Sequence, residues 1–495
     1  MVQHLVALPT IGERAPCNGA SGGGCSASSS DGQSSCGSAA GQSDLPPALW
    51  DKIKDHPCYS EDAHHYFARM HVAVAPACNI QCHYCNRKYD CSNESRPGVV
   101  SEKLTPEEAL RKVLAVAAVV PQLSVLGIAG PGDALANAAN TFRTFELAAK
   151  ALPHLKLCLS TNGLAVPDHV DTIAAFNIEH VTMTINMVDP EVGMRIYPWV
   201  FFNHKRWEGR DAARILHERQ MEGLEALTSR GILVKVNSVL IPGINDDHLA
   251  EVNDAVRARG AFLHNIMPLI SDPAHGTHYG LSGQRGPTPA ELKAMQDRLG
   301  DGAKLMKHCR QCRADAVGLL GEDRGAEFTL DTLGETPVFD PGAREIYLSV
   351  VERERADRQR AKELAEMALN EVTAETPLLV AVATKGGGRI NLHFGHATEF
   401  QIYEVDSRGA RFAGHRRADA YCRGGQGEEE VLDGILKTLD GVSALLCAKI
   451  GSAPRQKLEA VGIAASDQYA FEYIEASAIA WYLDREQSGT MAQTA

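Results

Sequence analysis

Three cysteines within one short loop are the strongest chemical signal in the sequence. Cys78, Cys82 and Cys85 follow one another at a Cys-x3-Cys-x2-Cys spacing, directly after the apolar run 71–75. Three thiolates can hold three irons of a cubane [4Fe-4S] cluster and leave the fourth iron open, whereas structural zinc sites and electron-carrying cubanes usually take four protein ligands. The spacing therefore predicts a cluster with one iron free to bind a small molecule. A partial zinc site or a chance grouping is the alternative.

The remaining thiols of the central region are too many for one further cluster. The chain has 13 cysteines, and in a reducing cytosol thiols serve metals or catalysis rather than disulfides. Two more clusters with three protein ligands each need six, so an imidazole would complete the set. The five central thiols are Cys58, Cys91, Cys158, Cys309 and Cys312, and the nearby histidines are His56, His64, His65, His71 and His83. A lone histidine is more often structural, and Cys158 could be a small buried hydrophobe.

The elements that must position these residues alternate between short apolar runs and helical segments from Leu45 onward. This alternation is typical of parallel βα units. Strands are expected near residues 71–75, 123–128, 155–160, 180–186, 233–240 and 262–267. Helices are expected at 105–119, 141–151, 168–176, 212–230 and 248–259. Six such units predict an α/β fold with a partial (β/α)6 TIM-like barrel rather than a closed eightfold one.

Polar and glycine-rich motifs follow these strands at their carboxyl ends, where chemistry gathers in such folds. The three-cysteine loop follows the first strand, Gly130-Pro131-Gly132-Asp133 follows the second, and residues 160–163 and 241–245 follow the third and fifth. Along the fourth strand, Thr182 and Thr184 alternate with apolar residues, so one face is polar. Each glycine-rich motif alone could be a tight turn. Their shared edge favours a ligand site.

Composition divides the chain into four segments. Residues 1–44 are rich in Gly and Ser and lack large apolar groups, which predicts a disordered tail. Residues 45–320 form the expected barrel, and 321–375 an irregular stretch followed by a charged, solvated linker helix without chemistry. Residues 376–490 form a second, small α/β domain. The tail thiols Cys17, Cys25 and Cys36 could bind metal or take part in redox chemistry, but unstructured thiols without a role are the simpler interpretation.

The balance of charge and hydropathy excludes some classes of partner. Lys plus Arg number 49 and Asp plus Glu number 62, which gives a net charge of −13. This balance argues against a broad nucleic-acid surface. The amino terminus lacks a basic region followed by an apolar core, and no segment approaches the roughly 18 apolar residues of a membrane span. We therefore expect a cytoplasmic protein without nucleic-acid or membrane partners.

The three-cysteine loop, with Tyr84 just before its last cysteine, resembles that of the radical S-adenosylmethionine (SAM) enzymes. The resemblance implies that the open iron of a [4Fe-4S] cluster chelates SAM and that an electron from the cluster breaks its sulfonium to give a 5′-deoxyadenosyl radical. It also suggests where SAM lies. The expected contacts are Tyr84 against the adenine, Gly130 and Gly132 at the methionine amino group, Ser160, Asn162 and Thr184 at polar atoms, and Ile241 near the adenine.

A narrower resemblance covers about residues 51–318. The motifs at 56–66, 85–91, 130–133 and 308–315 are similar to those of NifB-type nitrogenase cofactor biosynthesis proteins, and Gly-Pro-Gly-Asp stands where radical SAM enzymes usually have Gly-Gly-Glu. Residues 381–463 resemble the small NifX-like cofactor-binding domain, for which a ribonuclease H-like fold is expected. There His393, His396 and Cys422 could contact a cluster or be surface and turn residues.

This resemblance implies a reaction of lyase type with methyl transfer. Two [4Fe-4S] substrate clusters would fuse into an eight-iron, carbide-containing cluster, with one SAM giving a methyl group and a second giving the radical. The ligands suggested are Cys91, Cys158 and His56 for one substrate cluster and Cys58, Cys309 and Cys312 for the other. Partners would be cluster donors and cofactor carrier or scaffold proteins. A peptide-modifying radical SAM enzyme with auxiliary clusters and a non-enzymatic iron-sulfur carrier are the alternatives. The sequence assigns no general acid or base.

Overall fold

The computed structural model describes residues 46–91, 99–300, 313–319, 322–334, 338–369, 377–423, 426–427 and 429–493. The predicted tail and two of the expected ligands, Cys309 and Cys312, lie outside these residues. Within the described part of the chain, no helix is long and apolar enough to cross a membrane.

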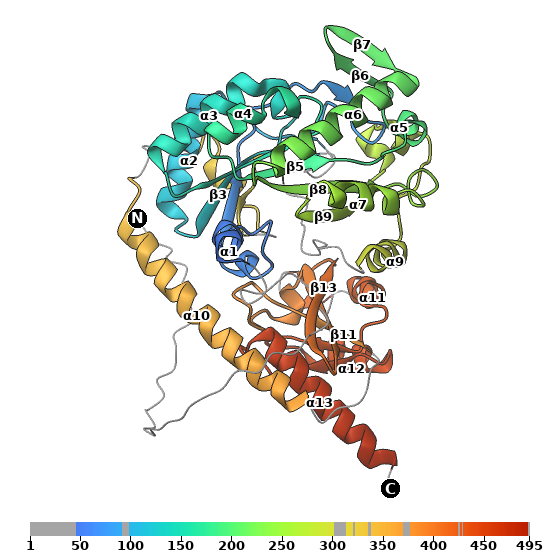
Figure 1. The fold of residues 1–495 in the computed structure, drawn as a ribbon. Helices are drawn as coiled ribbons and strands as arrows, with labels where there is room; N and C mark the ends of the chain where they lie inside the picture. Colours follow the sequence, from blue (N-terminus) through green and yellow to red (C-terminus); the bar gives the residue numbers. More distant parts are fainter. Residues whose placement is uncertain are drawn as a thin grey trace, which may run out of the picture. The chain divides into compact units, whose positions relative to one another are not determined.

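A seven-stranded sheet forms the core of the first half of the chain, in the order β10-β1-β3-β4-β5-β8-β9 (Figure 1). Six of its strands run parallel, and β10 pairs antiparallel with β1. The strands are β1 (Ala68–His71), β3 (Leu123–Ile128), β4 (Lys156–Thr161), β5 (His180–Thr184), β8 (Leu233–Leu240), β9 (Leu263–Pro268) and β10 (Val317–Gly318). The predicted partial barrel of six parallel strands is confirmed.

Helices connect successive parallel strands, as expected for βα units. They are α2 (Pro106–Val119), α3 (Ala138–Ala151), α4 (Val170–Ala175), α6 (Gly209–Thr228) and α7 (Leu249–Ala258). Helix α2 begins at a capping box, in which Thr105 and Glu108 satisfy each other's backbone N–H groups. The apolar residues of these helices form one continuous core with alternate residues of the strands, such as Leu157 and Leu159 of β4. The opposite face of the sheet is thereby left for polar side chains.

The first strand lies earlier than the sequence suggested. The apolar run 71–75 was expected to be the strand, but β1 ends at His71, and the following residues bond first to the end of β3 and then to the loop after it. Val72 N–H donates to Gly127 O at 3.2 Å, and Ala75 N–H donates to Gly130 O at 3.2 Å. The chain thus leaves the sheet just before the cysteine loop.

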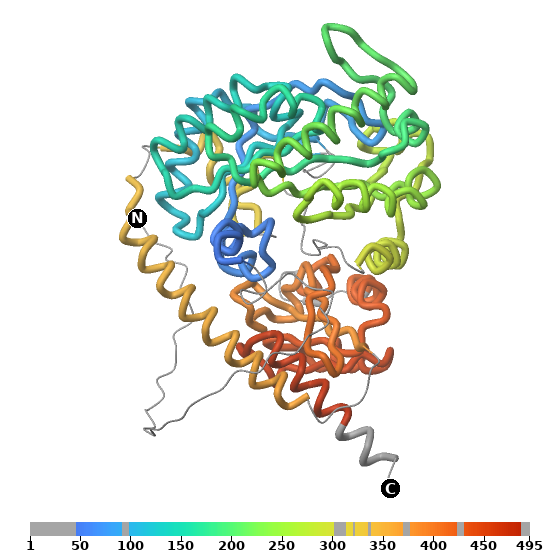
Figure 2. The backbone as a smooth tube through the Cα atoms, viewed as in Figure 1, coloured from blue at the N-terminus to red at the C-terminus, as the bar shows by residue number. Residues whose placement is uncertain are grey.

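A small second sheet, not predicted from the sequence, is attached to the cysteine loop. It has the order β2-β6-β7, with β2 at Ile80–Gln81, β6 at Trp199–Phe202 and β7 at Lys205–Glu208. Figure 2 shows β6 and β7 as a hairpin that projects beyond the helices. The remaining helices of this half are α1 (Pro47–Ile53), α5 (Pro190–Ile196), α8 (His278–Leu281) and α9 (Pro289–Gly300).

Helix α10 (Pro341–Ala368) occupies the strongly charged segment. Most residues of the predicted helix are exposed or half-buried, but Val351 and Arg358 are buried, and Arg358 is only 7% exposed. Its guanidinium pairs with Glu475, and with Asp62 at 3.1 Å. Arg344 Nη1 also donates to Leu123 O at 2.6 Å. An arginine can be buried where carboxylates and carbonyl groups take up its donors, and a charge count along the sequence does not show such partners.

The terminal domain is built on a five-stranded mixed sheet with the order β13-β12-β11-β16-β17. The first three strands in the chain are antiparallel neighbours, and the last two run parallel to β11. This 3-2-1-4-5 order is the ribonuclease H-like arrangement that was expected. The elements are β11 (Leu378–Val382), β12 (Glu399–Asp406), β13 (Gly409–Arg417), β14 (Cys422–Arg423), β15 (Gln426–Gly427), α11 (Glu429–Thr438), β16 (Ala444–Leu446), α12 (Ser452–Ala460), β17 (Ala464–Ser466) and α13 (Ile474–Gln493).

Candidate functional site

A cleft lies at the carboxyl ends of the parallel strands. The three loop cysteines and Cys91 line it, together with residues from the ends of β4 and β5. Those strand residues are Ser160, Thr161, Asn162 and Thr184, and the loop after β3 adds Ala129, Pro131, Gly132 and Asp133. The structure thus brings the predicted cluster ligands and most of the predicted SAM contacts to one cavity.

The cysteine loop is held in shape by its own side chains. Gln81 Nε2 donates to Cys82 O at 3.0 Å and to Cys85 O at 2.9 Å. Arg87 Nη2 donates to Ile80 O at 2.6 Å and to Cys78 O at 3.1 Å. These bonds occupy the loop carbonyl groups, so the backbone turns around a single centre with the thiols on the cleft side.

Burial makes the loop thiols poor acids without a metal. It raises the pKa of Cys78 to about 12 and that of Cys82 well above its usual range, and the neighbouring thiols add to the effect. A metal that binds here must displace these protons, which thiophilic iron can do. No three His, Cys, Asp or Glu side chains among the described residues are grouped to hold a single ion; a cubane takes each thiolate on a different iron. The donor set therefore fits an iron-sulfur cluster.

The Gly130-Pro131-Gly132-Asp133 loop packs against the segment that leads into the cysteines. Gly132 N–H donates to Ala75 O at 2.6 Å, and Asp133 N–H donates to Ala77 O at 2.8 Å. A Cβ atom on Gly132 would lie only 2.2 Å from Ala77 O. Only glycine fits at this close approach of two backbones, and the approach sets the position from which Cys78 enters the cleft.

Asp133 ties this loop to the end of β4. Its buried carboxylate accepts from Asn162 N–H at 2.6 Å, from Thr161 Oγ1 at 3.0 Å, and from the N–H groups of Leu135 and Ala136, each at 3.0 Å. Burial raises the pKa of Asp133, and these hydrogen bonds oppose that rise. Asn162 in turn donates from Nδ2 to Asn79 Oδ1 at 2.7 Å. The carboxylate thus fixes Asn162 beside the cysteine loop.

Two of the expected SAM contacts lie behind the cleft wall. Tyr84 and Ile241 belong to one buried apolar cluster, and neither is among the described residues that line the cleft. The Tyr84 hydroxyl accepts from Asn186 Nδ2 at 2.7 Å. The Tyr84 ring therefore packs against the buried side of the cysteine loop. The contacts of Tyr84 and Ile241 with adenine stay predictions.

A second set of candidate ligands lies deeper on the inner face of the sheet. His71, Gly127, Cys158 and His180 pair side by side across β1, β3, β4 and β5, so they share one face. Cys158 is two residues before Ser160 of the cleft, on the same face and roughly 7 Å farther from the rim. The register of the sheet therefore places Cys158 inside the barrel, below the rim where Ser160 lies.

His56 lies next to this inner row. Its ring is 4.3 Å from the ring of His180, measured between centroids, and its Nδ1 accepts from Cys58 N–H at 3.2 Å. His56 is fully buried, and that burial lowers its pKa well below the usual range. Cys58 packs with Leu233 at the amino end of β8. The His56-Pro57-Cys58 motif therefore lies at the base of the barrel rather than at its rim.

The other four candidate histidines lie in three different parts of the structure. His71 faces the barrel interior over Gly127, and its Nδ1 is 3.2 Å from Arg313 O. His65 lies 3.1 Å from the Arg358 guanidinium, and His64 stacks on His65. His83 stacks on His278. Of the five candidate histidines, His71 belongs to the inner row and His56 lies beside it.

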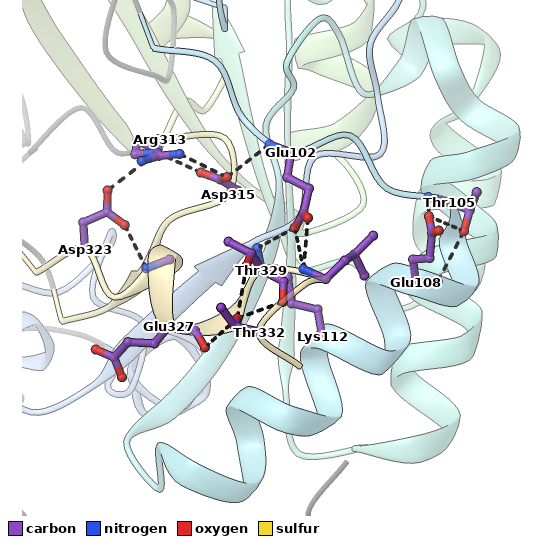
Figure 3. A network of polar contacts seen from close by, with 12 residues as sticks. Glu102, Thr105, Glu108, Lys112, Arg313, Asp315, Asp323, Glu327, Thr329 and Thr332 are labelled. Atoms are coloured by element: carbon purple, nitrogen blue, oxygen red, sulfur yellow. Dashed lines mark hydrogen bonds and ion pairs between the residues drawn. The ribbon is translucent and has the colours of Figure 1, made fainter. Parts of the chain in front are cut away.

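The chain that follows Cys312 is anchored beside Cys91. Ala314 N–H donates to the carboxylate of Asp90 at 3.3 Å, and Glu102 N–H donates to Asp315 Oδ2 at 3.3 Å. Figure 3 shows the contacts of Glu102 and Asp315, in which Asp315 also accepts from Arg313 and Glu102 pairs with Lys112. Two residues after Cys312, the backbone is therefore fixed to the residue that precedes Cys91.

Two inner-face residues were missed from the sequence. His180 adjoins Cys158 in the sheet, and Lys235 on β8 pairs with Thr182 while being only 4% exposed. The Lys235 ammonium contributes to the lowered pKa values of both His56 and His71. The period-2 placement of Lys235 and Asn237 within an apolar strand was the available signal. Burial lowers the pKa of His180 to about 3, so its imidazole is neutral, and Lys235 is the cationic member of this polar lining.

In the terminal domain, the three candidate ligands surround Gly395. The rings of His393 and His396 are 5.0 Å apart, and His393 Nδ1 accepts from Gly395 N–H at 2.9 Å. A Cβ atom on Gly395 would lie 2.3 Å from Cys422 Sγ. The three side chains are neighbours, and their contact with a cluster stays a prediction.

Comparison with known proteins identifies the family to which this chain belongs. Residues 72–256 match the Radical SAM superfamily, and residues 376–482 match the family described as Dinitrogenase iron-molybdenum cofactor. The FeMo cofactor biosynthesis protein NifB of Herbaspirillum seropedicae is 62% identical over 472 residues, which are 94% of this chain and 90% of that protein. The chain belongs to the NifB family. The Rhodobacter capsulatus member is 65% identical over 443 residues, 89% of this chain and 98% of that protein.

Membership in the NifB family makes the chain a radical SAM protein of FeMo cofactor biosynthesis, with a terminal domain of the Dinitrogenase iron-molybdenum cofactor family. The superfamily implies a [4Fe-4S] cluster and SAM at the three-cysteine loop. Among solved structures, Streptococcus suis SuiB matches with a TM-score of 0.35 and 12% identity over 49% of each chain.

Proposed function

We propose that this chain fuses two [4Fe-4S] substrate clusters into an eight-iron, carbide-containing precursor of the FeMo cofactor. SAM would serve both as the methyl donor for the carbide and as the source of the 5′-deoxyadenosyl radical. The observation that carries the proposal is the inner row below the SAM cleft. Cys158, with His56 beside His180, supplies metal-binding side chains that a SAM site alone does not need.

The residues of the cleft would bind and orient SAM. When bound to Cys78, Cys82 and Cys85, the cluster supplies the electron that cleaves SAM. Ser160, Asn162 and Thr184 offer polar groups along the cleft wall, and Asp133 holds the end of β4 in register. The buried apolar cluster behind the cysteine loop keeps water from this side of the cleft.

The substrate clusters would lie between the cleft and the base of the barrel. Cys91, Cys158 and His56 are proposed for one cluster and Cys58, Cys309 and Cys312 for the other. The nearness of His56 to the inner row supports the first set. The bond between Ala314 and Asp90 brings the chain after Cys312 close to Cys91, which supports two clusters that adjoin each other. Lys235 would offset part of their negative charge.

The products formed from SAM test this function directly. Reconstituted protein treated anaerobically with dithionite and SAM should form S-adenosylhomocysteine and 5′-deoxyadenosine together. A Cys82→Ser variant should form neither, whereas Cys158→Ser should keep SAM cleavage to 5′-deoxyadenosine and lose S-adenosylhomocysteine. A peptide-modifying enzyme would give 5′-deoxyadenosine alone, and a carrier would give neither product.

The terminal domain and the cellular setting complete the proposal. His393, His396 and Cys422 would receive or hold the product cluster before it passes to a carrier or scaffold protein. Cluster donors would supply the substrates, and the 13 cysteines of the chain favour a location in the reducing cytoplasm. Transfer of the product to a purified carrier protein, compared between the wild type and a His393→Ala variant, measures this role. An unchanged transfer rate would remove His393 from it.

A further inference from the structure

The hairpin of β6 and β7 is bonded directly to the backbone of the cluster loop. Ile80 pairs with Val200 and Gln81 with Trp199, between the first and second cluster cysteines. Phe201 N–H also donates to Asn79 O at 2.7 Å. Figure 1 shows the two strands extending outward from α6, away from the parallel sheet. The hairpin is thus a surface extension of the loop that holds the cluster.

Aromatic and cationic side chains cover this hairpin. The guanidinium carbon of Arg87 and that of Arg206 each lie 5.1 Å from the centre of the Trp199 ring. Lys205 Nζ lies 3.8 Å from the centre of the Trp207 ring. Phe201 is 48% exposed, although it is a large apolar residue. Phe201 pairs with Arg206 across the hairpin and so shares a face with Trp199, whereas Lys205 lies on the other face. An exposed apolar side chain beside arginine side chains is typical of a contact surface rather than of a solvated turn.

The charge of this surface contrasts with that of the chain, whose net charge is −13. Arg87, Lys88, Lys205 and Arg206 are exposed around the cluster loop and the hairpin. Within the described residues, only Arg206 among them has a carboxylate partner, Glu208 at 2.9 Å. The net positive charge of this group lies next to the one cluster that must receive an electron from outside. Such a patch would attract an acidic partner and orient it toward the loop.

We propose that the β6–β7 hairpin, with Arg87 and Lys88, is the docking surface for an acidic ferredoxin that reduces the cluster at Cys78, Cys82 and Cys85. The inference rests on the proposed function, because only SAM cleavage needs this electron. One electron leaves the ferredoxin cluster, which is oxidised by one unit, and the three-cysteine cluster is reduced by one unit. No bond is made or broken. Electron-transfer encounters are small and transient, which suits a patch the size of one hairpin.

Charge reversal on the hairpin tests the proposal. In a Lys205→Glu/Arg206→Glu variant, 5′-deoxyadenosine formation driven by a reduced two-[4Fe-4S] ferredoxin should fall at least tenfold at low salt. Formation driven by dithionite should keep the wild-type rate, because a small reductant needs no docking surface. A Lys150→Glu/Arg360→Glu control has the same change in net charge on distant helices and should leave both rates unchanged. The conservative Lys205→Arg/Arg206→Lys variant should restore the ferredoxin-driven rate.

Several results would overturn the assignment. An unchanged ferredoxin-driven rate would show that the hairpin does not dock the carrier. An equal loss with both reductants would make the hairpin a structural support of the cluster loop. A concentration-dependent dimer in the wild type that the charge reversal abolishes would assign the surface to a second copy of the chain. If the wild-type protein forms no 5′-deoxyadenosine with dithionite, the proposed function itself is wrong. That result differs from a loss of the ferredoxin-driven rate alone, so the two hypotheses fail in distinguishable ways.

Discussion

Replacement of Asp133 by Asn tests how the structure positions the SAM cleft. The carboxylate has two oxygens and receives hydrogen bonds from four donors, two in its own loop and two at the end of β4. An amide keeps one acceptor oxygen and turns the other side into a donor. If the oxygen stays with Leu135 and Ala136, the amide nitrogen faces Asn162 N–H, and that buried donor loses its partner.

The cost follows from these contacts. A hydrogen bond to a charged group contributes about 1.5–3 kcal/mol, and a buried N–H without a partner costs about 1–3 kcal/mol. We therefore expect local destabilisation of about 2–4 kcal/mol at the end of β4. Because Asn162 and Ser160 line the cleft, SAM should bind at least tenfold more weakly, the equivalent of about 1.4 kcal/mol.

Amide hydrogen exchange of the peptide that covers residues 156–164 measures the local opening free energy. Equilibrium dialysis of SAM against the reconstituted protein measures the affinity. Asp171→Asn is the matched control, because Asp171 is exposed and, among the described residues, forms an ion pair with Arg230 alone. Wild-type exchange and affinity in Asp133→Asn would contradict the argument, since they would mean that the carboxyl is already protonated at neutral pH and donates as an amide does.

Three further outcomes follow from single contacts. Gly132→Ala should lower cluster occupancy and the midpoint of thermal unfolding, because its Cβ would lie 2.2 Å from Ala77 O; full iron loading would contradict this. Lys112→Met should leave that midpoint unchanged or raise it, because the fully buried ammonium is 3.8 Å from Glu102 and such weak buried pairs are often replaced without loss; a large drop by calorimetry would refute this. Burial raises the pKa of Asp406, but bonds from Arg411 and Arg408 outweigh it and hold that pKa well below its usual range. The stabilisation that Asp406 gives to the folded domain should therefore be complete above about pH 4 and decline as pH falls further. The decline should be measurable as faster amide exchange in β12 and β13. Asp406→Asn should remove this pH dependence.

The sheet could be predicted from the sequence because its strands are short apolar runs bounded by turns. Strands β3 and β8 lie at the predicted residues. The first strand was misplaced, since residues 72–75 are as apolar as a strand, yet Ala75 bonds to Gly130 in the loop after β3. The β6–β7 hairpin was missed because its residues carry charge and aromatic groups on both faces, without the alternation of a half-buried strand.

The site could be predicted where spacing along the chain determines it, and not where pairing across the sheet does. The three-cysteine spacing is local, and its thiols do line one cleft. The depth of Cys158 and its neighbour His180 depends on the register between β4 and β5. The burial of Arg358 depends on Glu475, which lies 117 residues away. Partners so far apart in sequence are visible only in the fold.

Iron content tests the central claim most directly. Protein reconstituted anaerobically and freed of unbound iron should contain about twelve irons per chain, because three cubane clusters hold four each. Cys82→Ala and Cys158→Ala should each lose about four of them. A wild-type value of about four irons, unaffected by Cys158→Ala, would leave a single SAM cluster and contradict the proposal that this barrel holds two substrate clusters.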